Sequence, residues 1–140
     1  MLQKVLVVND NELLLMIVTK VISLAKFANE TITATDGEAA LKIFDDLINN
    51  NNTATAPAFI FLDLNMPGMN GWEFLEIFST NYAKIFPNIK VAILSASVEM
   101  KDMLLLVKYP IIIEYISTPL SIELLESIEL KYHTLQESYH

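Results

Sequence analysis

The sequence predicts an α/β domain in which helices cover both faces of a parallel sheet. Five short apolar runs alternate with longer segments of helical character along the 140 residues. Three of these runs (VLVV, FIFL and VAIL) are almost continuously apolar, which is typical of strands buried on both faces. Strands that alternate with helices form parallel sheets with right-handed crossovers.

Local signals support the order of the elements. The pair Asp36-Gly37 begins the second helix, and Asn70 with Glu73 three residues later predicts a capping box at the third. Ser97 is a suitable N-cap for the fourth helix. With no repeat and no second domain in the pattern, we expect one domain over residues 1–140 and no output domain. The expected strands are 4–8, 31–35, 59–62, 91–94 and 111–116, and the expected helices are 11–28, 37–48, 71–83, 98–107 and 121–136.

Composition and charge exclude several classes of function. The net charge is −8, and all nine basic residues are lysines. Without arginine, the residue preferred for phosphate and guanine contacts, and without a basic cluster, nucleic-acid binding is disfavoured. The chain has no cysteine, hence no disulfide and no Cys-ligated metal. No apolar run reaches the length of a membrane span, so we expect a soluble, cytoplasmic protein.

The residues that follow the strands indicate a site. In a doubly wound sheet, ligands bind beyond the carboxyl ends of the strands. Here those positions hold acids and hydroxyls: Asp10 after the first strand, Asp63 after the third, Ser95 after the fourth and Thr118 after the fifth. Asp63 could act as a nucleophile or metal ligand, and Asp10 could share one Mg2+ with it. Alternatively, both acids cap the neighbouring helices.

The combined motifs are more specific than either acid alone. VLVVND, FLDLNMPGMNGWEFL, AILSAS and EYISTPL occur in this order, and the chain resembles, over almost its whole length, the receiver domain of two-component response regulators. The resemblance implies a flavodoxin-like (βα)5 fold, a doubly wound parallel sheet with strand order 2-1-3-4-5. It also implies a signalling domain that takes a phosphoryl group from a histidine kinase onto an aspartate with the help of Mg2+.

The resemblance also assigns roles residue by residue. Asp63 is the expected phosphoacceptor and a metal ligand, Asp10 a direct Mg2+ ligand, and the backbone carbonyl of Asn65 another. Ser95 matches the switch hydroxyl that turns towards the phosphoryl group. Tyr115 matches the switch aromatic that moves with it.

Two residues depart from the family pattern. Asn9 stands where a second acid is usual, and Thr118 replaces the usual lysine before Pro119, a bond that the family has in the cis form. Together with Asp10 and Asp63 they give the same charge of −2 as the family's three acids and one lysine. Thr118, however, cannot form the charge-assisted bond of about 1.5–3 kcal/mol to a phosphoryl oxygen. Asn9 can orient a metal-bound water, but it attracts the cation less. We expect weak Mg2+ binding, slower or less stable phosphorylation and looser coupling to Ser95.

These residues lead to one expected function and one alternative. The expectation is a single-domain response regulator, phosphorylated on Asp63 by a histidine kinase or phosphotransfer protein, that signals by protein contact and is not an enzyme. The alternative is a pseudo-receiver that binds its partner without phosphorylation. A phosphatase of the haloacid dehalogenase type is disfavoured because Asn65 stands where a second acid is needed. A flavodoxin is disfavoured because the first loop is acidic.

Two apolar helices are candidate partner surfaces. Leu13–Val18 lies in the first helix, on which kinases dock in receivers. The fourth helix contains Met100 and the run Met103–Val107, more apolar than one buried stripe requires. Either the face made by helix four, strand five and helix five binds a target or a second copy, or Pro110 shortens the helix and these residues pack inside. Trp72 is expected to be a core and helix-packing residue rather than part of a ligand site.

Overall fold

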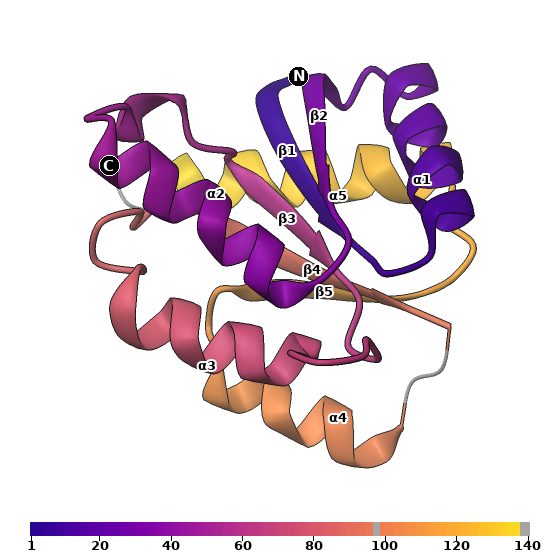
Figure 1. The fold of residues 1–140 in the computed structure, drawn as a ribbon. Helices are drawn as coiled ribbons and strands as arrows, with labels where there is room; N and C mark the ends of the chain where they lie inside the picture. The colour runs from indigo at the N-terminus through magenta and orange to yellow at the C-terminus, as the bar shows by residue number, and fades with distance from the viewer. Residues whose placement is uncertain (97–98, 138–140) are drawn as a thin grey trace.

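The computed structural model describes residues 1–96 and 99–137 as five strands that alternate with five α-helices (Figure 1). The strands are β1 (Leu2–Val8), β2 (Ala28–Ala34), β3 (Phe59–Leu62), β4 (Lys90–Ser95) and β5 (Ile112–Ser117). The α-helices are α1 (Glu12–Leu24), α2 (Gly37–Asn49), α3 (Gly71–Asn81), α4 (Met100–Leu105) and α5 (Ile122–Glu137). Two short 3-10 helices, η1 (Thr53–Thr55) and η2 (Leu106–Lys108), lie in the connections.

All strand pairs of the sheet are parallel, and their order is β2-β1-β3-β4-β5. This confirms the predicted doubly wound fold and its strand order. In register, Val8 of β1 pairs with Leu62 of β3, so the residues that follow them emerge at the same edge. The positions after β4 and β5 reach that edge too, because Ser95 pairs with Ser117.

Helices cover both faces of the sheet (Figure 1), and a separate core that contains aromatic rings lies on each face. Under α2 and α3, the ring of Phe44 lies 5.1 Å from that of Phe78 and 5.2 Å from that of Phe86. Under α1 and α5, Phe27 packs edge-on against Phe59 at 5.8 Å. Burial of these large rings on both faces supplies the main stabilisation of the fold.

Polar residues begin the helices that border the site. The Asn11 side chain accepts hydrogen bonds from two backbone N–H groups in the first turn of α1. Asp36 caps α2 through the Ala39 N–H. Asn70 and Glu73 form the predicted capping box at the start of α3. Such caps satisfy N–H groups that have no partner within the helix.

Two predicted helix boundaries were wrong. The first helix ends at Leu24 rather than at 28, because Lys26 takes a left-handed conformation (φ 54°) and turns the chain into β2. The fourth segment is α-helical only over Met100–Leu105 and continues as η2. Its predicted N-cap, Ser97, and position 98 lie outside the described residues. Within the described ranges, no helix has the length and apolarity needed to cross a membrane.

Candidate functional site

The expected site residues meet at the carboxyl edge of the sheet. The Asp63 N–H donates to the carbonyl of Val8 at 3.0 Å, which holds the start of the β3–α3 loop beside the end of β1. The Thr118 N–H donates to the carbonyl of Ser95 at 3.1 Å, which joins the ends of β4 and β5 in the same way. Both Asp10 and Ser95 act electrostatically on the Asp63 carboxyl, so these three side chains are neighbours.

Asp63 is partly buried, and its environment raises its pKa. Burial is the largest cause, and the negative charge of Asp10 acts in the same direction. Hydrogen bonds from the backbone N–H groups of Asn65 and Leu64 act against this rise, as does the nearby Ser95 hydroxyl. The Asn65 N–H lies 3.3 Å from Asp63 Oδ1. A cation bound beside the carboxylates of Asp63 and Asp10 would act against both causes of the rise.

The loop after Asp63 packs directly on the first turn of α3. The Gly71 N–H donates to the Leu64 carbonyl at 3.1 Å. A Cβ at Gly71 would lie 2.5 Å from the Asp63 carbonyl oxygen and 2.8 Å from Leu64 Cα, so any larger residue would collide with the backbone. This close approach explains the last glycine of the motif.

Two buried hydroxyls of the site lack hydrogen-bond partners. Ser95 is 1% exposed, and although its Oγ is near enough to influence Asp63, it forms no hydrogen bond of ordinary geometry. The Tyr115 hydroxyl is also buried and unpaired. Burial, with the charges of Asp102 and Glu99, raises the pKa of Tyr115 to about 12. A buried hydroxyl without a partner lowers the stability of the fold, so a bound group that accepts a hydrogen bond from either hydroxyl would recover that loss.

Asn9 has a structural contact that the sequence did not indicate. Its side chain is buried, and its Oδ1 accepts the Asn11 N–H at 2.8 Å. This bond holds the turn between β1 and α1. The next residue, Asp10, is exposed to solvent.

The donor set at this edge suits a hard divalent cation. Asp10 and Asp63 supply two neighbouring carboxylates, and Asn65, whose backbone carbonyl is the third predicted ligand, lies in the loop that follows Asp63. Mg2+ usually binds proteins through one or two carboxylates and keeps several waters. Among the described residues, no three or more His, Cys, Asp or Glu side chains are grouped to hold a metal. The oxygen ligands thus fit Mg2+ and leave most of its coordination sphere to water or substrate.

At the lysine position of the family, Thr118 is partly buried and its bond to Pro119 is cis. Two lysines of the fourth helical segment, which could otherwise replace the missing charge, have other partners. Lys101 Nζ pairs with Glu99 at 3.3 Å, and Lys108 Nζ pairs with Glu76 at 3.4 Å.

The model of the response regulator receiver domain matches residues 5–128. This chain belongs to that family. Receiver domains are signalling domains that interact with kinases and other proteins, rather than classical enzymes. No curated protein sequence matches the chain significantly.

Solved structures of receivers share the fold. A two-component response regulator from Cytophaga hutchinsonii is 26% identical with a TM-score of 0.84, over 95% of this chain and 98% of the other. One from Legionella pneumophila is 27% identical with a TM-score of 0.72, over 97% and 98%. The CheX-CheY-BeF3-Mg2+ complex from Borrelia burgdorferi is 22% identical with a TM-score of 0.71, over 93% and 89%. The last supports the fold alone.

The structure resolves the open question about the apolar helices of this receiver. Met100, Met103 and Leu104 of α4 are exposed, and so is Val107 of η2, so the interpretation that the fourth segment packs its apolar residues inside was wrong for these four. Their spacing places them along one helix face. In α1, residues 13, 16 and 17 face solvent, whereas residues 15 and 18 are buried.

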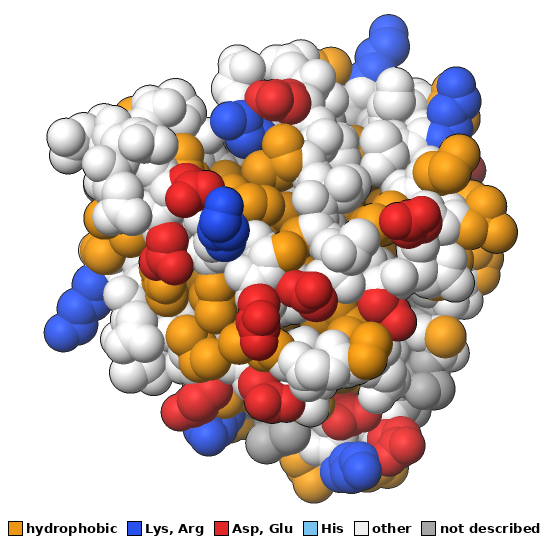
Figure 2. Space-filling model, in the orientation of Figure 1, with side chains coloured by type: hydrophobic (Ala, Val, Ile, Leu, Met, Phe, Trp, Pro, Cys, Tyr) orange, Lys and Arg blue, Asp and Glu red, His pale blue; other side chains and the backbone are white. Residues whose placement is uncertain are grey.

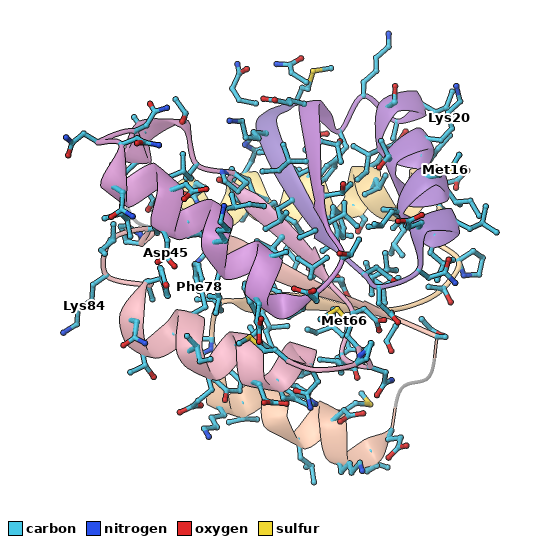
Figure 3. All side chains as sticks on the ribbon, in the orientation of Figure 1. Met16, Lys20, Asp45, Met66, Phe78 and Lys84 are labelled. Carbon is cyan, nitrogen blue, oxygen red and sulfur yellow. The ribbon has the colours of Figure 1, made fainter. Side chains whose placement is uncertain are left out.

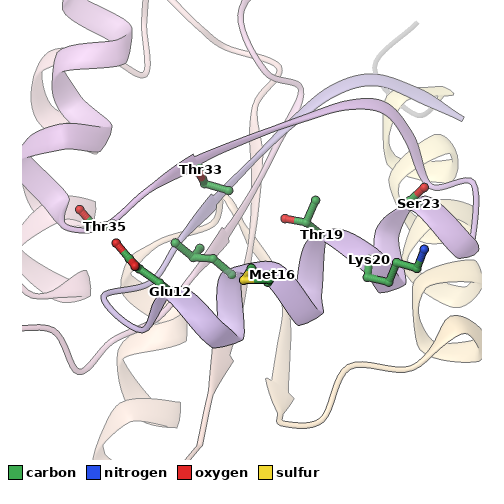
Figure 4. Close-up of a pocket in the computed structure, with 8 residues that line it drawn as sticks. Glu12, Met16, Thr19, Lys20, Ser23, Thr33 and Thr35 are labelled. Atoms are coloured by element: carbon green, nitrogen blue, oxygen red, sulfur yellow. The ribbon is translucent and has the colours of Figure 1, made fainter.

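A groove of about 670 Å3 lies between α1 and β2 (Figure 4). Met16, Thr19, Lys20 and Ser23 line it from the helix, and Thr33 lines it from the strand. Nothing in the sequence pattern indicated this groove, because it joins an edge strand to a helix face.

Proposed function

We propose that this receiver accepts a phosphoryl group on Asp63 and signals by protein contact. The observation that carries the proposal is the carboxylate of Asp63, partly buried with a raised pKa, next to Asp10 and to the unpaired hydroxyl of Ser95. The donor would be a histidine kinase or a phosphotransfer protein, as in the family. The single-domain organisation expected from the sequence stays a prediction.

The chemistry requires few groups. An Asp63 oxygen forms a bond to phosphorus while the P–N bond of a phosphohistidine breaks, and the imidazole leaves with a proton from water. Phosphoryl transfer depends on positioning and neutralisation of charge. When bound, Mg2+ would supply most of that neutralisation, and Asp10, Asp63 and the Asn65 carbonyl would hold it. Ser95 would donate its hydroxyl to a phosphoryl oxygen, which pairs a group that is otherwise buried without a partner.

The two departures predict that this chemistry is weakened. Asn9 brings no charge to the cation, and one lone pair of its amide oxygen already accepts the Asn11 N–H. Thr118 offers the phosphoryl group a neutral hydroxyl at most. We expect phosphorylation to require Mg2+ concentrations at the high end of those that receivers usually need, and we expect the acyl phosphate on Asp63 to hydrolyse quickly.

Labelling with a small acyl phosphate tests the proposal. The intact chain, incubated with the phosphodonor and Mg2+, should gain one phosphate by mass spectrometry. Asp63→Asn should gain none, and Asp36→Asn, which changes an acid on the neighbouring loop, should label like the natural chain. Absence of label on Asp63 at high Mg2+ and with a kinase as donor would refute the proposal.

A second candidate function is a receiver that binds its partner without phosphorylation. The contact of Asn9 with Asn11 favours it, because the bond gives the Asn9 side chain a structural role that does not depend on phosphorylation. In that case beryllofluoride and Mg2+ together should leave the NMR signals of Asp63, Ser95 and Tyr115 unchanged. Asp63→Asn would then leave partner binding intact.

The exposed face of α4 is the proposed contact for a downstream protein or a second copy. The four exposed apolar side chains of α4 and η2, two of them methionines, form an adaptable surface. The outward side of α1, with Leu13 and Ile17, is the proposed contact for the phosphodonor protein.

A further inference from the structure

Trp72, the second residue of α3, joins that helix to α4. Its indole Nε1 donates to Asp102 Oδ1 at 3.1 Å. Its ring stacks on Tyr109, with centroids 6.0 Å apart and planes at 24°. The side chain is partly buried against the core, in agreement with its prediction as a core and helix-packing residue, and the polar contact with α4 is an addition to that prediction.

Further contacts hold the far end of the same segment. Glu76, four residues after Trp72 on α3, accepts the Tyr109 hydroxyl at 2.5 Å and pairs with Lys108 at 3.4 Å. α3 thus contacts the start of α4 at Asp102 and its continuation at Tyr109. Figure 2 shows acidic side chains gathered around α3 and α4 on this side of the molecule.

Trp72 follows directly on the part of α3 that packs against the phosphoacceptor loop. Gly71 donates to the Leu64 carbonyl, and it approaches the Asp63 backbone so closely that a Cβ at this position would lie 2.5 Å from the Asp63 carbonyl oxygen. A cleft of about 630 Å3 lies between this loop and α4. Trp72 lines it from α3 and Asp102 lines it from α4, so their hydrogen bond spans the cleft.

We infer that Trp72 is a positioning residue that couples the backbone at Asp63 to α4 through Asp102. The inference rests on the proposed function, since it concerns how occupancy of Asp63 reaches α4. A group bound to the carboxylate competes with the Asn65 N–H for Oδ1 and so shifts the turn at 63–65. Because Gly71 packs tightly on this turn, the first turn of α3 moves with it and Trp72 displaces Asp102.

This connection is separate from the one through Ser95 and Tyr115. It involves two hydrogen bonds, Gly71 to Leu64 and Trp72 to Asp102, and no residue of β4 or β5. The two routes meet at α4, because the charge of Asp102 also acts on Tyr115. A pair of variants at Asp102 can therefore separate the hydrogen bond from the charge.

The test follows the NMR signals of α4 in the whole chain as Mg2+ and beryllofluoride are added. Trp72→Phe keeps a ring to stack on Tyr109 but loses the N–H donor. Asp102→Asn and Asp102→Ala both remove the charge, but only Asn retains an oxygen that can accept the indole N–H. The amide of Leu64 reports whether the site itself is occupied.

We expect the α4 shifts to fall by about threefold or more in Trp72→Phe and Asp102→Ala, and to persist in Asp102→Asn. The Leu64 shift should remain in all three variants. The inference is overturned if Leu64 responds and α4 responds equally in Trp72→Phe and the natural chain. It is also overturned if Asp102→Asn behaves like Asp102→Ala.

Failure of the proposed function gives a different result. If Leu64 does not respond even in the natural chain, phosphoryl chemistry is refuted and the coupling is tested in the ligand-free protein. Amide hydrogen exchange in α4 and at 63–65 should then be faster in Trp72→Phe and Asp102→Ala than in Asp102→Asn. Equal rates in all variants would overturn the coupling. Trp72 is the single tryptophan, so its fluorescence checks that each Asp102 variant changes the indole environment.

Discussion

Replacement of Thr118 by lysine tests the charge argument at the site. Thr118 is partly buried at the end of β5, and its N–H is bonded to the carbonyl of Ser95. A lysine at this position begins its side chain beside the residue whose hydroxyl acts on Asp63. Its ammonium group can therefore reach a phosphoryl group on that carboxylate.

The size of the gain follows from the exchange of one donor for another. A neutral hydroxyl contributes about 0.5–1.5 kcal/mol and a charged donor about 1.5–3 kcal/mol. The difference of about 1–1.5 kcal/mol corresponds to about five- to thirteenfold in affinity for a phosphoryl analogue. Position 118 is partly exposed, so solvent screening favours the lower end.

The assay is a titration with beryllofluoride at saturating Mg2+, followed by the Leu64 NMR signal. Saturating Mg2+ is needed because a lysine in the empty pocket also repels the cation. Thr118→Met is the matched control, since methionine is long and flexible but carries no charge. Asn9→Asp should instead lower the Mg2+ concentration required. Equal affinities for Thr118→Lys and the natural chain, or an equal gain in Thr118→Met, would refute the charge argument.

Three further predictions concern stability. Asp63→Asn should raise the melting temperature at neutral pH, because it removes a buried charge that Asp10 repels. Because the pKa of Asp63 is raised in the folded protein, ionisation of this group lowers stability as the pH rises through that value. The gain in melting temperature of Asp63→Asn should therefore vanish below the pKa of an unfolded Asp. A gain that persists at that low pH would contradict this cause. Gly71→Ala should lower the free energy of unfolding in urea by about 1–3 kcal/mol, since the added Cβ would lie 2.5 Å from a backbone oxygen. Gly68→Ala is the comparison: its Cβ meets no atom within 4 Å, so it should lose stability only through the positive φ of this position. Phe44→Ala should cost about 3–5 kcal/mol, because its ring is fully buried, and a loss below 1 kcal/mol would mean that the core collapses around it.

The sequence was sufficient to predict the sheet, because its signals are local. Val5–Val8 and Phe59–Leu62 are apolar at every position, as strands covered on both faces require. The strand order came from the family resemblance, since no local pattern says which strands are neighbours. The positions of Asp10, Asp63 and Ser95 followed once the strands were known, because carboxyl ends of parallel strands share one edge.

The contacts that sequence reasoning missed join residues distant in the chain or depend on one backbone angle. Trp72 and Asp102 are 30 residues apart, and an indole in an apolar helix gives no sign of its donor's partner. The helical pattern of the first segment continues past Leu24, but the left-handed backbone at Lys26 prevents the helix from continuing. The sequence did not show this end, because a left-handed residue other than glycine has no reliable sequence signature. Asn9 was considered only as a replacement for an acid, so its bond to Asn11 was not anticipated.

The methionines differ sharply in their access to oxidants. Met100 on α4 is 76% exposed and Met16 on α1 is 70% exposed, whereas Met66, in the loop after Asp63, is 7% exposed. Figure 3 labels Met16 on α1 and Met66 in that loop. Oxidation to the sulfoxide makes an apolar side chain polar. A mild oxidant should therefore modify Met16 and Met100, on the two candidate partner faces, before it modifies Met66. Protection of either thioether when a partner is added would show which helix that partner covers.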